Sequence, residues 1–566
     1  MVAVTRTFAL DDTFLSPQVL HPPPTRHALL AFLLALAAVL HIGTASWGDL
    51  YDGPESQLAG GAKEMLESGQ FLVPTNNGVP LLQTPPLAYW AVALSNKVFG
   101  RSPTAARLPI GLAMIGSVAL IFLIGERLTD YWRGFAAGLI HLCSAGAFLS
   151  GRLVAPEPIF ALFVTGAMYC AVRGYQNRRF RKAWFAGFWG CASLATLTNG
   201  PGAILLLAGI LAVAALLFRE ARIRFRPLLH WTNLVLFLLV VAPWFVWAHL
   251  HFPALFSRFW IKGIVGLPRL SDLLFHLAWG FPAFLLVLPG LIFAPRKILR
   301  PDEFSFGDAL PLGWIASGLI AALLIGEPHA FSSMAAAPAF ALFAAGAWKR
   351  IVRPLRRAGI LLMLVIGFSG AGFVCFRPAI VATFLDHPLT DSTWSSLRLL
   401  AQISMGSLFL FGLGAIFFLK QRAETTLVLA LAAMVPIGFC LVEGRSLAAP
   451  FFSLAEAAQY LNQRLGGNGQ VLYEGSLWSG NSLSFYLEKK FFLVNQSPDF
   501  FEQDIAARNK YLDENFVLEA WDRSDPIYLI VDESRVSHWQ QLITNRVHIY
   551  HQVTTCGSRV VLSNQL

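Results

Sequence analysis

Two carboxylates begin a polar segment that follows the first strongly apolar stretch of the chain. Asp52 and Glu55 lie in the sequence DGPE, and the segment that holds them, Gly48–Trp90, is the longest polar interruption before residue 444. An acidic side chain held beside a membrane span can act as general base on an acceptor hydroxyl or a phosphate. The same pair can also be a capping box, with Asp52 as N-cap and Glu55 as N3 residue, that only satisfies backbone amides. The two roles are compatible.

A third carboxylate, Glu157, begins an apolar stretch. An ionised side chain is costly there unless it faces a cavity or a cation, so Glu157 is either functional or paired with Arg152. Chemistry on a phosphate ester needs a carboxylate to take the acceptor proton and cations to neutralise the departing phosphate. The cations expected on the same side of the membrane are Arg107, Arg152, Arg258, Lys262 and Arg269.

The last three of these cations have a simpler explanation. Arg258, Lys262 and Arg269 share their stretch with Phe259 and Trp260. Basic and aromatic residues together are typical of the membrane surface, so these side chains could serve only as interfacial anchors.

A helix is predicted to carry the first two carboxylates. From Glu55 to Ser68 the apolar residues Leu58, Ala62 and Met65 recur on one helical face, and Gly69 is a suitable stop.

Composition places the chain in a membrane. It has 566 residues, of which 55% are hydrophobic and 13% charged, and a mean hydropathy of +0.57. A soluble enzyme of this size is less apolar. The net charge of +10 does not indicate nucleic acid, because the basic residues form short clusters between apolar runs. The six cysteines have no spacing typical of disulfides or metal ligands.

About thirteen segments are apolar enough to span a membrane. They lie near 28–47, 106–125, 133–150, 157–173, 184–198, 200–218, 230–249, 274–294, 310–326, 331–347, 357–376, 399–419 and 425–443. Connections after even-numbered spans are rich in Lys and Arg, which predicts that they face the cytoplasm. The N-terminal tail, 1–27, is therefore expected inside, and the first loop, 48–105, and the tail, 444–566, outside.

The tail after the spans changes in character. Strands are predicted at Gln470–Glu474, Phe491–Asn495, Ile527–Asp532, Val547–Val553 and Arg559–Ser563, with helices near 453–465, 480–488 and 535–543. The predicted architecture is thus an all-α polytopic membrane domain, 28–443, followed by a small α/β domain.

Several short motifs, in order and spacing, resemble the integral membrane glycosyltransferases of the C-type fold, in the branch of protein O-mannosyltransferases and lipid A aminoarabinose transferases. The motifs are Ala62–Gly69, Asn77–Pro80, Pro85–Trp90, Phe99-Gly100, Ala105–Pro109, Arg152 with Glu157, Thr198–Pro201 and Ala242–Trp244. The resemblance covers the chain from about residue 40 to the tail and is strongest in the first 200 residues.

The resemblance implies transfer of a sugar from a polyprenyl-phosphate carrier to a lipid, glycan or protein acceptor at the outer face of a bacterial inner membrane. It implies a base in the first outer loop, for which we choose Glu55 over Asp52, with Glu157 as a further catalytic carboxylate. Tyr89, in the Pro85–Trp90 motif, is an expected substrate contact together with the five cations above. The sequence requires no cofactor, and we assign no metal ligands. Whether the reaction needs a divalent cation stays open.

Positions near the chemistry depart from the family pattern. The Asp-Glu pair of the family falls on Pro54 and Glu55, and Thr84 and Asn199 replace two lysines. These changes keep a non-catalytic, carrier-binding member of the fold as an alternative. A transporter or flippase is a further alternative, but it should show internal repeats of spans, which the sequence lacks.

Overall fold

The computed structural model describes residues 25–257, 260, 279–299, 304–324, 330–376, 390–466, 469–496, 511–522, 525–546 and 549–565. Its main elements are α1 Arg26–His41, α2 Pro54–Ser68, β1 Thr75–Asn76, β2 Val79–Pro80, α3 Leu87–Phe99, α4 Pro103–Leu128, α5 Tyr131–Cys143, α6 Ala145–Ser150, α7 Glu157–Gln176, α8 Arg181–Asn199, α9 Gly202–Leu217, α10 Arg219–Phe225, α11 Trp231–His251, α12 Pro253–Ser257, α14 Ala283–Phe293, α15 Pro295–Leu299, α16 Phe306–Leu324, α17 Ala330–Arg350, α18 Arg353–Phe376, α20 Asp391–Phe418, α21 Ala423–Ala432 and α22 Met434–Phe452. The C-terminal part contains α23 Ala455–Arg464, β3 Gln470–Glu474, α24 Asn481–Tyr486, β4 Phe492–Val494, β5 Tyr511–Leu512, α25 Glu514–Trp521, β6 Ile527–Asp532, α26 Val536–Asn545, β7 His551–Cys556 and β8 Arg559–Ser563.

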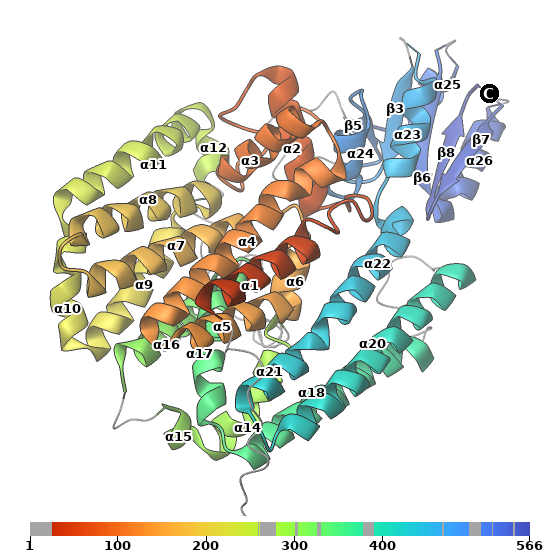
Figure 1. Ribbon diagram of the computed structural model, residues 1–566. Helices are drawn as coiled ribbons and strands as arrows, with labels where there is room; N and C mark the ends of the chain where they lie inside the picture. Colours follow the sequence, from red (N-terminus) through yellow and green to blue (C-terminus); the bar gives the residue numbers. More distant parts are fainter. Residues whose placement is uncertain are drawn as a thin grey trace, which may run out of the picture.

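Long apolar helices form the bulk of the molecule and make it a multi-pass membrane protein (Figure 1). Each predicted apolar segment overlaps a described helix. Within the described ranges, six helices have the length and hydropathy of a span, with α21 and α22 counted as one, and α1, α9, α14 and part of α16 are shorter apolar helices. These lengths do not confirm about thirteen spans, so that count stays a prediction.

The first outer loop folds over one end of the bundle as α2, a two-stranded hairpin and α3. The hairpin turns at Asn77 and Gly78, whose positive φ angles of 50° and 78° suit an Asn-Gly turn. Helix α2 ends at Gly69 with φ 72°, as predicted.

The predicted N-cap of α2 is wrong. The cap is Gly53, with φ 82° and no side-chain cap bond, because Pro54 occupies the first helical position, where its missing N–H costs nothing. Asp52 instead accepts a hydrogen bond from the backbone N–H of Ser482, at 2.7 Å, in the C-terminal domain.

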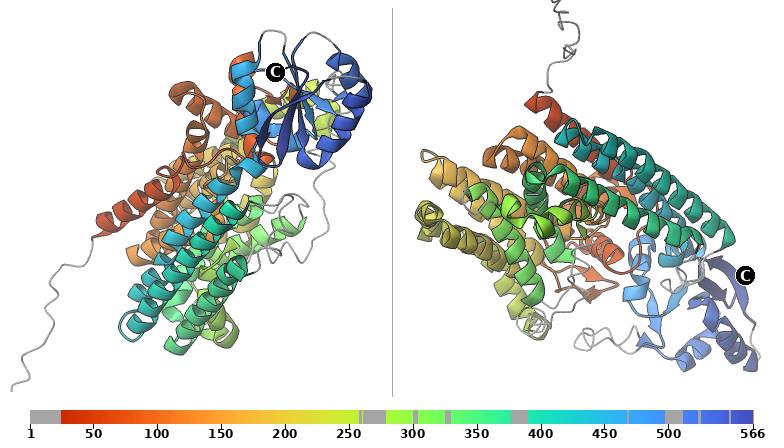
Figure 2. Two further views of the ribbon diagram at one scale, coloured as in Figure 1. Left: turned by 90° about the vertical axis from the view of Figure 1, so that its right-hand side faces the viewer. Right: turned by 90° about the horizontal axis from the view of Figure 1, so that it is seen from below.

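The C-terminal domain has a six-stranded sheet in the order β5-β4-β3-β6-β8-β7. The first four of these strands are parallel to one another. Strand β8 pairs antiparallel with β6, and β7 pairs antiparallel with β8. The predicted strands and helices are confirmed, except that β5 and α25 were missed and β7 begins later than predicted. Figure 2 shows this domain at one end of the bundle, beside the outer-loop elements.

Helix α24 joins the two parts of the molecule. Lys63 of α2 donates to the carbonyl of Ser484 at 3.0 Å and to that of Leu487, at the end of α24 where carbonyls lack helical partners. Asn77 of the hairpin turn donates to the Phe491 carbonyl at 2.9 Å. The outer loop is therefore packed between the membrane helices and the C-terminal domain.

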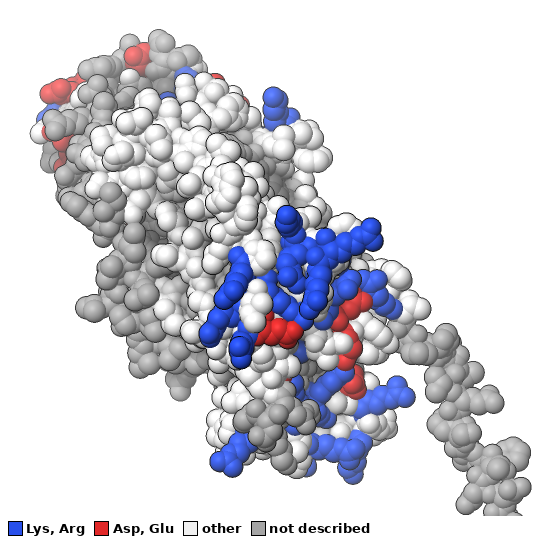
Figure 3. Space-filling model, turned by 90° about the vertical axis from the view of Figure 1, so that its left-hand side faces the viewer, with Lys and Arg blue, Asp and Glu red and all other residues white. Residues whose placement is uncertain are grey.

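Basic side chains gather at one end of the helical bundle. Figure 3 shows Lys and Arg concentrated in this region, while the broad surface above it carries few charges. The connections at 173–182 and 219–226 supply nine such residues: Arg173, Arg178, Arg179, Arg181, Lys182, Arg219, Arg222, Arg224 and Arg226. Connections on the cytoplasmic side of a membrane protein are rich in Lys and Arg, so this clustering agrees with the predicted topology.

Candidate functional site

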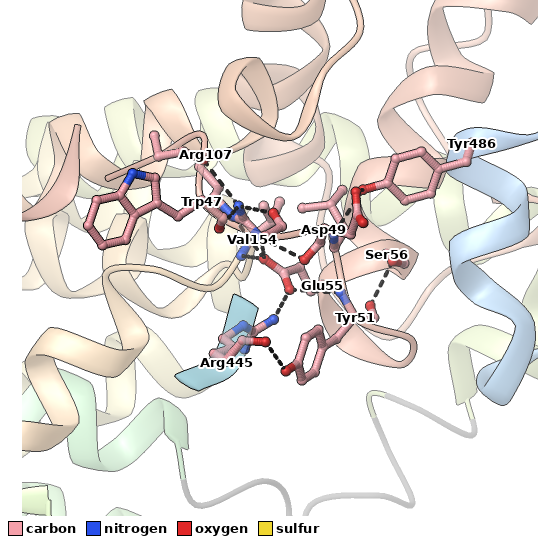
Figure 4. A network of polar contacts seen from close by, with 12 residues as sticks. Trp47, Asp49, Tyr51, Glu55, Ser56, Arg107, Val154, Arg445 and Tyr486 are labelled. Atoms are coloured by element: carbon pink, nitrogen blue, oxygen red, sulfur yellow. Dashed lines mark hydrogen bonds and ion pairs between the residues drawn. The ribbon is translucent and has the colours of Figure 1, made fainter. Parts of the chain in front are cut away.

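Glu55 is the centre of a buried charged cluster where the outer loop meets the membrane helices (Figure 4). Its residue is 3% exposed. One carboxylate oxygen accepts from Arg107 at 3.3 Å and from the backbone N–H of Val154 at 3.4 Å. The other accepts from the backbone N–H of Tyr51 at 3.0 Å and is ion-paired with Arg445. The carboxylate is thus fully occupied.

Arg107 holds the chain that leads into the outer loop. Besides its two contacts with Glu55, it donates to four backbone carbonyls, those of Ala45, Trp47, Gly48 and Asp49, at 2.8–3.1 Å. A guanidinium has five N–H groups, and all of those of Arg107 have acceptors here. Arg107 therefore positions the loop, and no N–H is left for a substrate phosphate in this arrangement.

Arg445 approaches the cluster from α22. That helix continues beyond residue 444 to Phe452, so Arg445 lies within it. Its guanidinium lies 3.8 Å from the ring centre of Tyr51, and its side chain is 25% exposed. Among the described residues, only the Arg445 nitrogen that is paired with Glu55 has a hydrogen-bond acceptor, and the rest of the guanidinium is partly exposed (Figure 4).

Arg152 is the third guanidinium of the cluster. It lies in the segment between α6 and α7, whose Val154 N–H reaches Glu55, and the residue is 4% exposed. Its Nε and Nη1 atoms are buried without a hydrogen-bond partner within the described structure. Buried polar groups are normally satisfied, so two orphan donors on one guanidinium suggest an anion site.

Glu157 follows in the same segment, as the first residue of α7. Its Oε2 atom is also buried without a hydrogen-bond partner among the described residues, and no ion pair with Arg152 is formed there. The expected alternative of a simple Glu157–Arg152 pair is therefore not what the structure shows.

The pKa values in the cluster depend on the three guanidinium groups of Arg107, Arg152 and Arg445, which outnumber the carboxylates of Glu55 and Asp49. Burial alone would raise the pKa of Glu55, but Arg445, Arg107 and the two backbone N–H groups bring it below its usual value. Burial and then the Arg107 guanidinium lower the pKa of Arg152. An added anion would relieve the repulsion among the three guanidinium groups.

The remaining predicted residues lie elsewhere. Asp52 faces the start of α24, and burial raises the pKa of its carboxyl to about 7 despite the Ser482 hydrogen bonds. Tyr89 is 3% exposed and packs against Gly61, where a Cβ would lie 2.7 Å from its ring. Such surroundings suit a core residue.

The other predicted cations lie beyond the part of the chain that can be described. These are Arg258, Lys262 and Arg269. The described residues also contain no group of three or more His, Cys, Asp or Glu side chains arranged for a metal ion.

Sequence reasoning missed Arg445 and Tyr51. Arg445 was assigned to the start of the tail, since the apolar run ends near residue 443. A usable signal existed: it is a basic residue on the predicted outer side of the last span, against the charge pattern of the chain. Tyr51 carries no such signal, because its role depends on Arg445.

Comparison with known proteins gives sequence relatives over part of the chain. The family described as dolichyl-phosphate-mannose-protein mannosyltransferase matches residues 83–247. An uncharacterised protein of Aquifex aeolicus is 29% identical over 245 residues, which are 42% of this chain and about half, 48%, of that protein. An undecaprenyl phosphate-alpha-4-amino-4-deoxy-L-arabinose arabinosyl transferase of Edwardsiella ictaluri is 27% identical over 431 residues, 72% of this chain and 76% of the relative.

The decisive likeness is structural. The crystal structure of ArnT from Cupriavidus metallidurans bound to undecaprenyl phosphate matches with a TM-score of 0.79 over 94% of this chain and 98% of that chain, at 18% identity. This chain has the fold of the C-type membrane glycosyltransferases. The predicted C-type fold with a C-terminal α/β domain is confirmed.

The departures from the C-type pattern can now be placed. Pro54 is the exposed first residue of α2, next to Glu55. Asn199 is the last residue of α8, before Gly200 with φ 81°. The position at which the C-type pattern has its Asp is thus occupied by Pro54, which has no ionisable side chain.

Proposed function

We propose that this protein transfers a sugar from a polyprenyl-phosphate donor to an acceptor hydroxyl or phosphate on the outer face of a bacterial inner membrane. The fold, the mannosyltransferase-family match and the arabinosyl transferase relatives support the reaction class. The undecaprenyl-phosphate-linked aminoarabinose named for the relatives is the first donor to test, and lipid, glycan and protein are the acceptor classes.

The observation that carries the proposal is the excess of guanidinium groups over carboxylates in the cluster. Arg107 and Arg445 both contact Glu55, and Arg152 lies within electrostatic range of all three groups. When the bond from the sugar to the phosphate oxygen breaks, its electron pair goes to the phosphate, whose negative charge rises. Arg152, with two unpartnered donors, and the exposed part of Arg445 are positioned to stabilise that charge.

We assign the base to Glu157, in place of our sequence-based choice of Glu55. Both oxygens of Glu55 are engaged by cations and backbone N–H groups, and its lowered pKa makes it a poor proton acceptor. Asp52 faces the C-terminal domain. Glu157 keeps an oxygen without a partner among the described residues and begins α7, three residues after Val154, whose N–H reaches Glu55. It takes the proton as the acceptor atom bonds to the sugar carbon.

The proposed topology places the N-terminus in the cytoplasm and the C-terminal domain in the periplasm. It rests on the basic residues clustered at one end of the bundle, opposite the outer loop (Figures 1 and 3). Labelling of a single cysteine at the exposed Ile549 from outside intact cells tests it. Labelling only after permeabilisation would contradict it.

A non-catalytic carrier-binding protein is the second candidate, and Pro54 at the family's acid position favours it. It shares the phosphate site with the enzyme and differs only in lacking transfer. A transfer assay therefore separates the two.

The experiment follows the labelled sugar from undecaprenyl-phosphate aminoarabinose, with purified protein in liposomes and lipid A as acceptor. We expect transfer by the wild type and a loss of about a hundredfold or more in Glu157→Gln, with undecaprenyl-phosphate binding retained. Binding without transfer by the wild type, across acceptor classes, would favour the carrier-binding protein. An active Glu157→Gln would remove Glu157 as base.

A further inference from the structure

Tyr486, in the C-terminal domain, is bonded directly to the outer loop. Its hydroxyl accepts from the backbone N–H of Leu50 at 2.9 Å and lies 3.1 Å from a carboxylate oxygen of Asp49, to which it donates (Figure 4). Burial raises the pKa of Tyr486, so the hydroxyl keeps the proton that it donates.

One of the two residues that Tyr486 holds, Asp49, is also held by Arg107. The Asp49 carbonyl accepts from Arg107 at 3.0 Å, next to the Gly48 carbonyl at 2.8 Å. Arg107 in turn holds Glu55. Two residues, Asp49 and Arg107, therefore connect Tyr486 to Glu55, and a hydrogen bond joins each residue of this chain to the next.

The same short loop also holds the Arg445 side chain in position. Tyr51 follows Leu50 directly, its N–H binds Glu55, and its ring lies under the Arg445 guanidinium. A shift of residues 49–51 would therefore move both the carboxylate partner and the aromatic support of Arg445.

Helix α24 is well fixed for this role. Its backbone binds Asp52 at the N–H of Ser482 and Lys63 at the carbonyl of Ser484. Tyr486 is the last residue of this helix, and its ring packs edge-on against Phe485, which is 1% exposed. The hydroxyl is consequently presented from a rigid support.

We infer that Tyr486 is a positioning residue for the donor-phosphate site, through which the C-terminal domain sets the geometry of Arg107, Glu55 and Arg445. This inference rests on the proposed function. It gives the C-terminal domain a part in the reaction although none of its described side chains forms a hydrogen bond with Glu55, Arg107 or Arg445.

The test compares two identical chemical changes in one domain. Tyr486→Phe keeps the ring and removes both hydroxyl bonds. Tyr528→Phe, in β6, removes a hydroxyl that makes no hydrogen bond within the described residues. The measurements are the Kd for undecaprenyl phosphate by native mass spectrometry, the kcat and KM of sugar transfer, and the melting temperature.

We expect Tyr486→Phe to weaken undecaprenyl-phosphate binding and to lower kcat/KM by about tenfold each, with a melting temperature only slightly below that of Tyr528→Phe. Asp49→Ala, which leaves the Leu50 bond, should show a smaller loss in the same direction. Equal binding and transfer in Tyr486→Phe and Tyr528→Phe would overturn this inference alone. A wild type that binds no undecaprenyl phosphate would overturn the proposed function and this inference together.

Discussion

Two charged clusters of this protein differ in how their charges are balanced. In the outer-loop cluster, Arg107 and Arg445 contact Glu55, and the nearby Arg152 has donors without partners among the described residues. In the C-terminal domain, Glu474 at the end of β3 accepts from Arg535 at 3.0 Å, from Trp539 at 2.8 Å and from Asn495 at 2.9 Å. Both oxygens of that carboxylate are satisfied from within the domain.

Under the proposed function, the first cluster binds a ligand and the second stabilises its own domain. The Glu474 network lies at the carboxyl ends of parallel strands, a common ligand position in α/β domains. Its groups nevertheless satisfy one another, with Glu514 accepting from His538 at 2.9 Å. Unpaired donors, rather than the number of charged residues, distinguish the outer-loop cluster.

Glu55→Gln should produce the largest effect, because it leaves Arg107 and Arg445 without their anion. Breaking a buried ion pair from one side typically costs about 3–5 kcal/mol of stability. We expect loss of undecaprenyl-phosphate binding together with a much lower melting temperature, measured by scanning fluorimetry in detergent. Glu157→Gln is the matched control and should melt as the wild type does. A stable, carrier-binding Glu55→Gln would show that the cluster does not depend on its central carboxylate.

Glu474→Gln should affect stability alone. The amide keeps one acceptor oxygen but loses the charge that faces Arg535, at a cost of about 1–3 kcal/mol. Chemical denaturation of the protein and its carrier binding are the measurements. A change in undecaprenyl-phosphate affinity would mean that the two clusters are coupled and that the distinction between them fails.

Asp52→Asn should change the pH dependence of stability, the smallest effect considered. The folded-state pKa of Asp52 is raised to about 7. The carboxyl therefore keeps its proton in the folded state while the unfolded chain has released it, and stability falls as pH rises from about 4 to 7. Melting temperatures across this range should fall less steeply in Asp52→Asn. Parallel slopes for the two proteins would contradict the burial of this carboxyl.

Sequence patterns predicted the elements well because they depend on local chemistry. The end of α2 at Gly69, the strands β3, β6 and β8 and the break between α8 and α9 all follow from periodicity and from Gly or Pro. The short strand β5 and helix α25 were missed, since two residues of strand carry no periodicity.

The site was harder to predict, because its residues come from distant parts of the chain. Four separate segments supply Glu55, Arg107, Arg152 and Arg445. No local pattern shows that Glu55 and Arg107 form an ion pair while Arg152 keeps donors without partners. The charged residues of the family-like motif Ala62–Gly69 contribute to the fold. Lys63 donates to a backbone carbonyl of α24, and the Glu64 carboxylate accepts from the Thr75 hydroxyl of the hairpin at 2.6 Å.

The most direct test of the central claim is carrier binding by Arg152→Gln. The Kd for undecaprenyl phosphate would be measured by native mass spectrometry at fixed salt, beside the wild type and Arg535→Gln. Loss of a charged hydrogen-bond donor should weaken binding about ten- to a hundredfold in Arg152→Gln. Arg535→Gln should bind as the wild type does. Equal affinity in all three proteins would show that the unpartnered guanidinium of Arg152 does not hold the carrier phosphate.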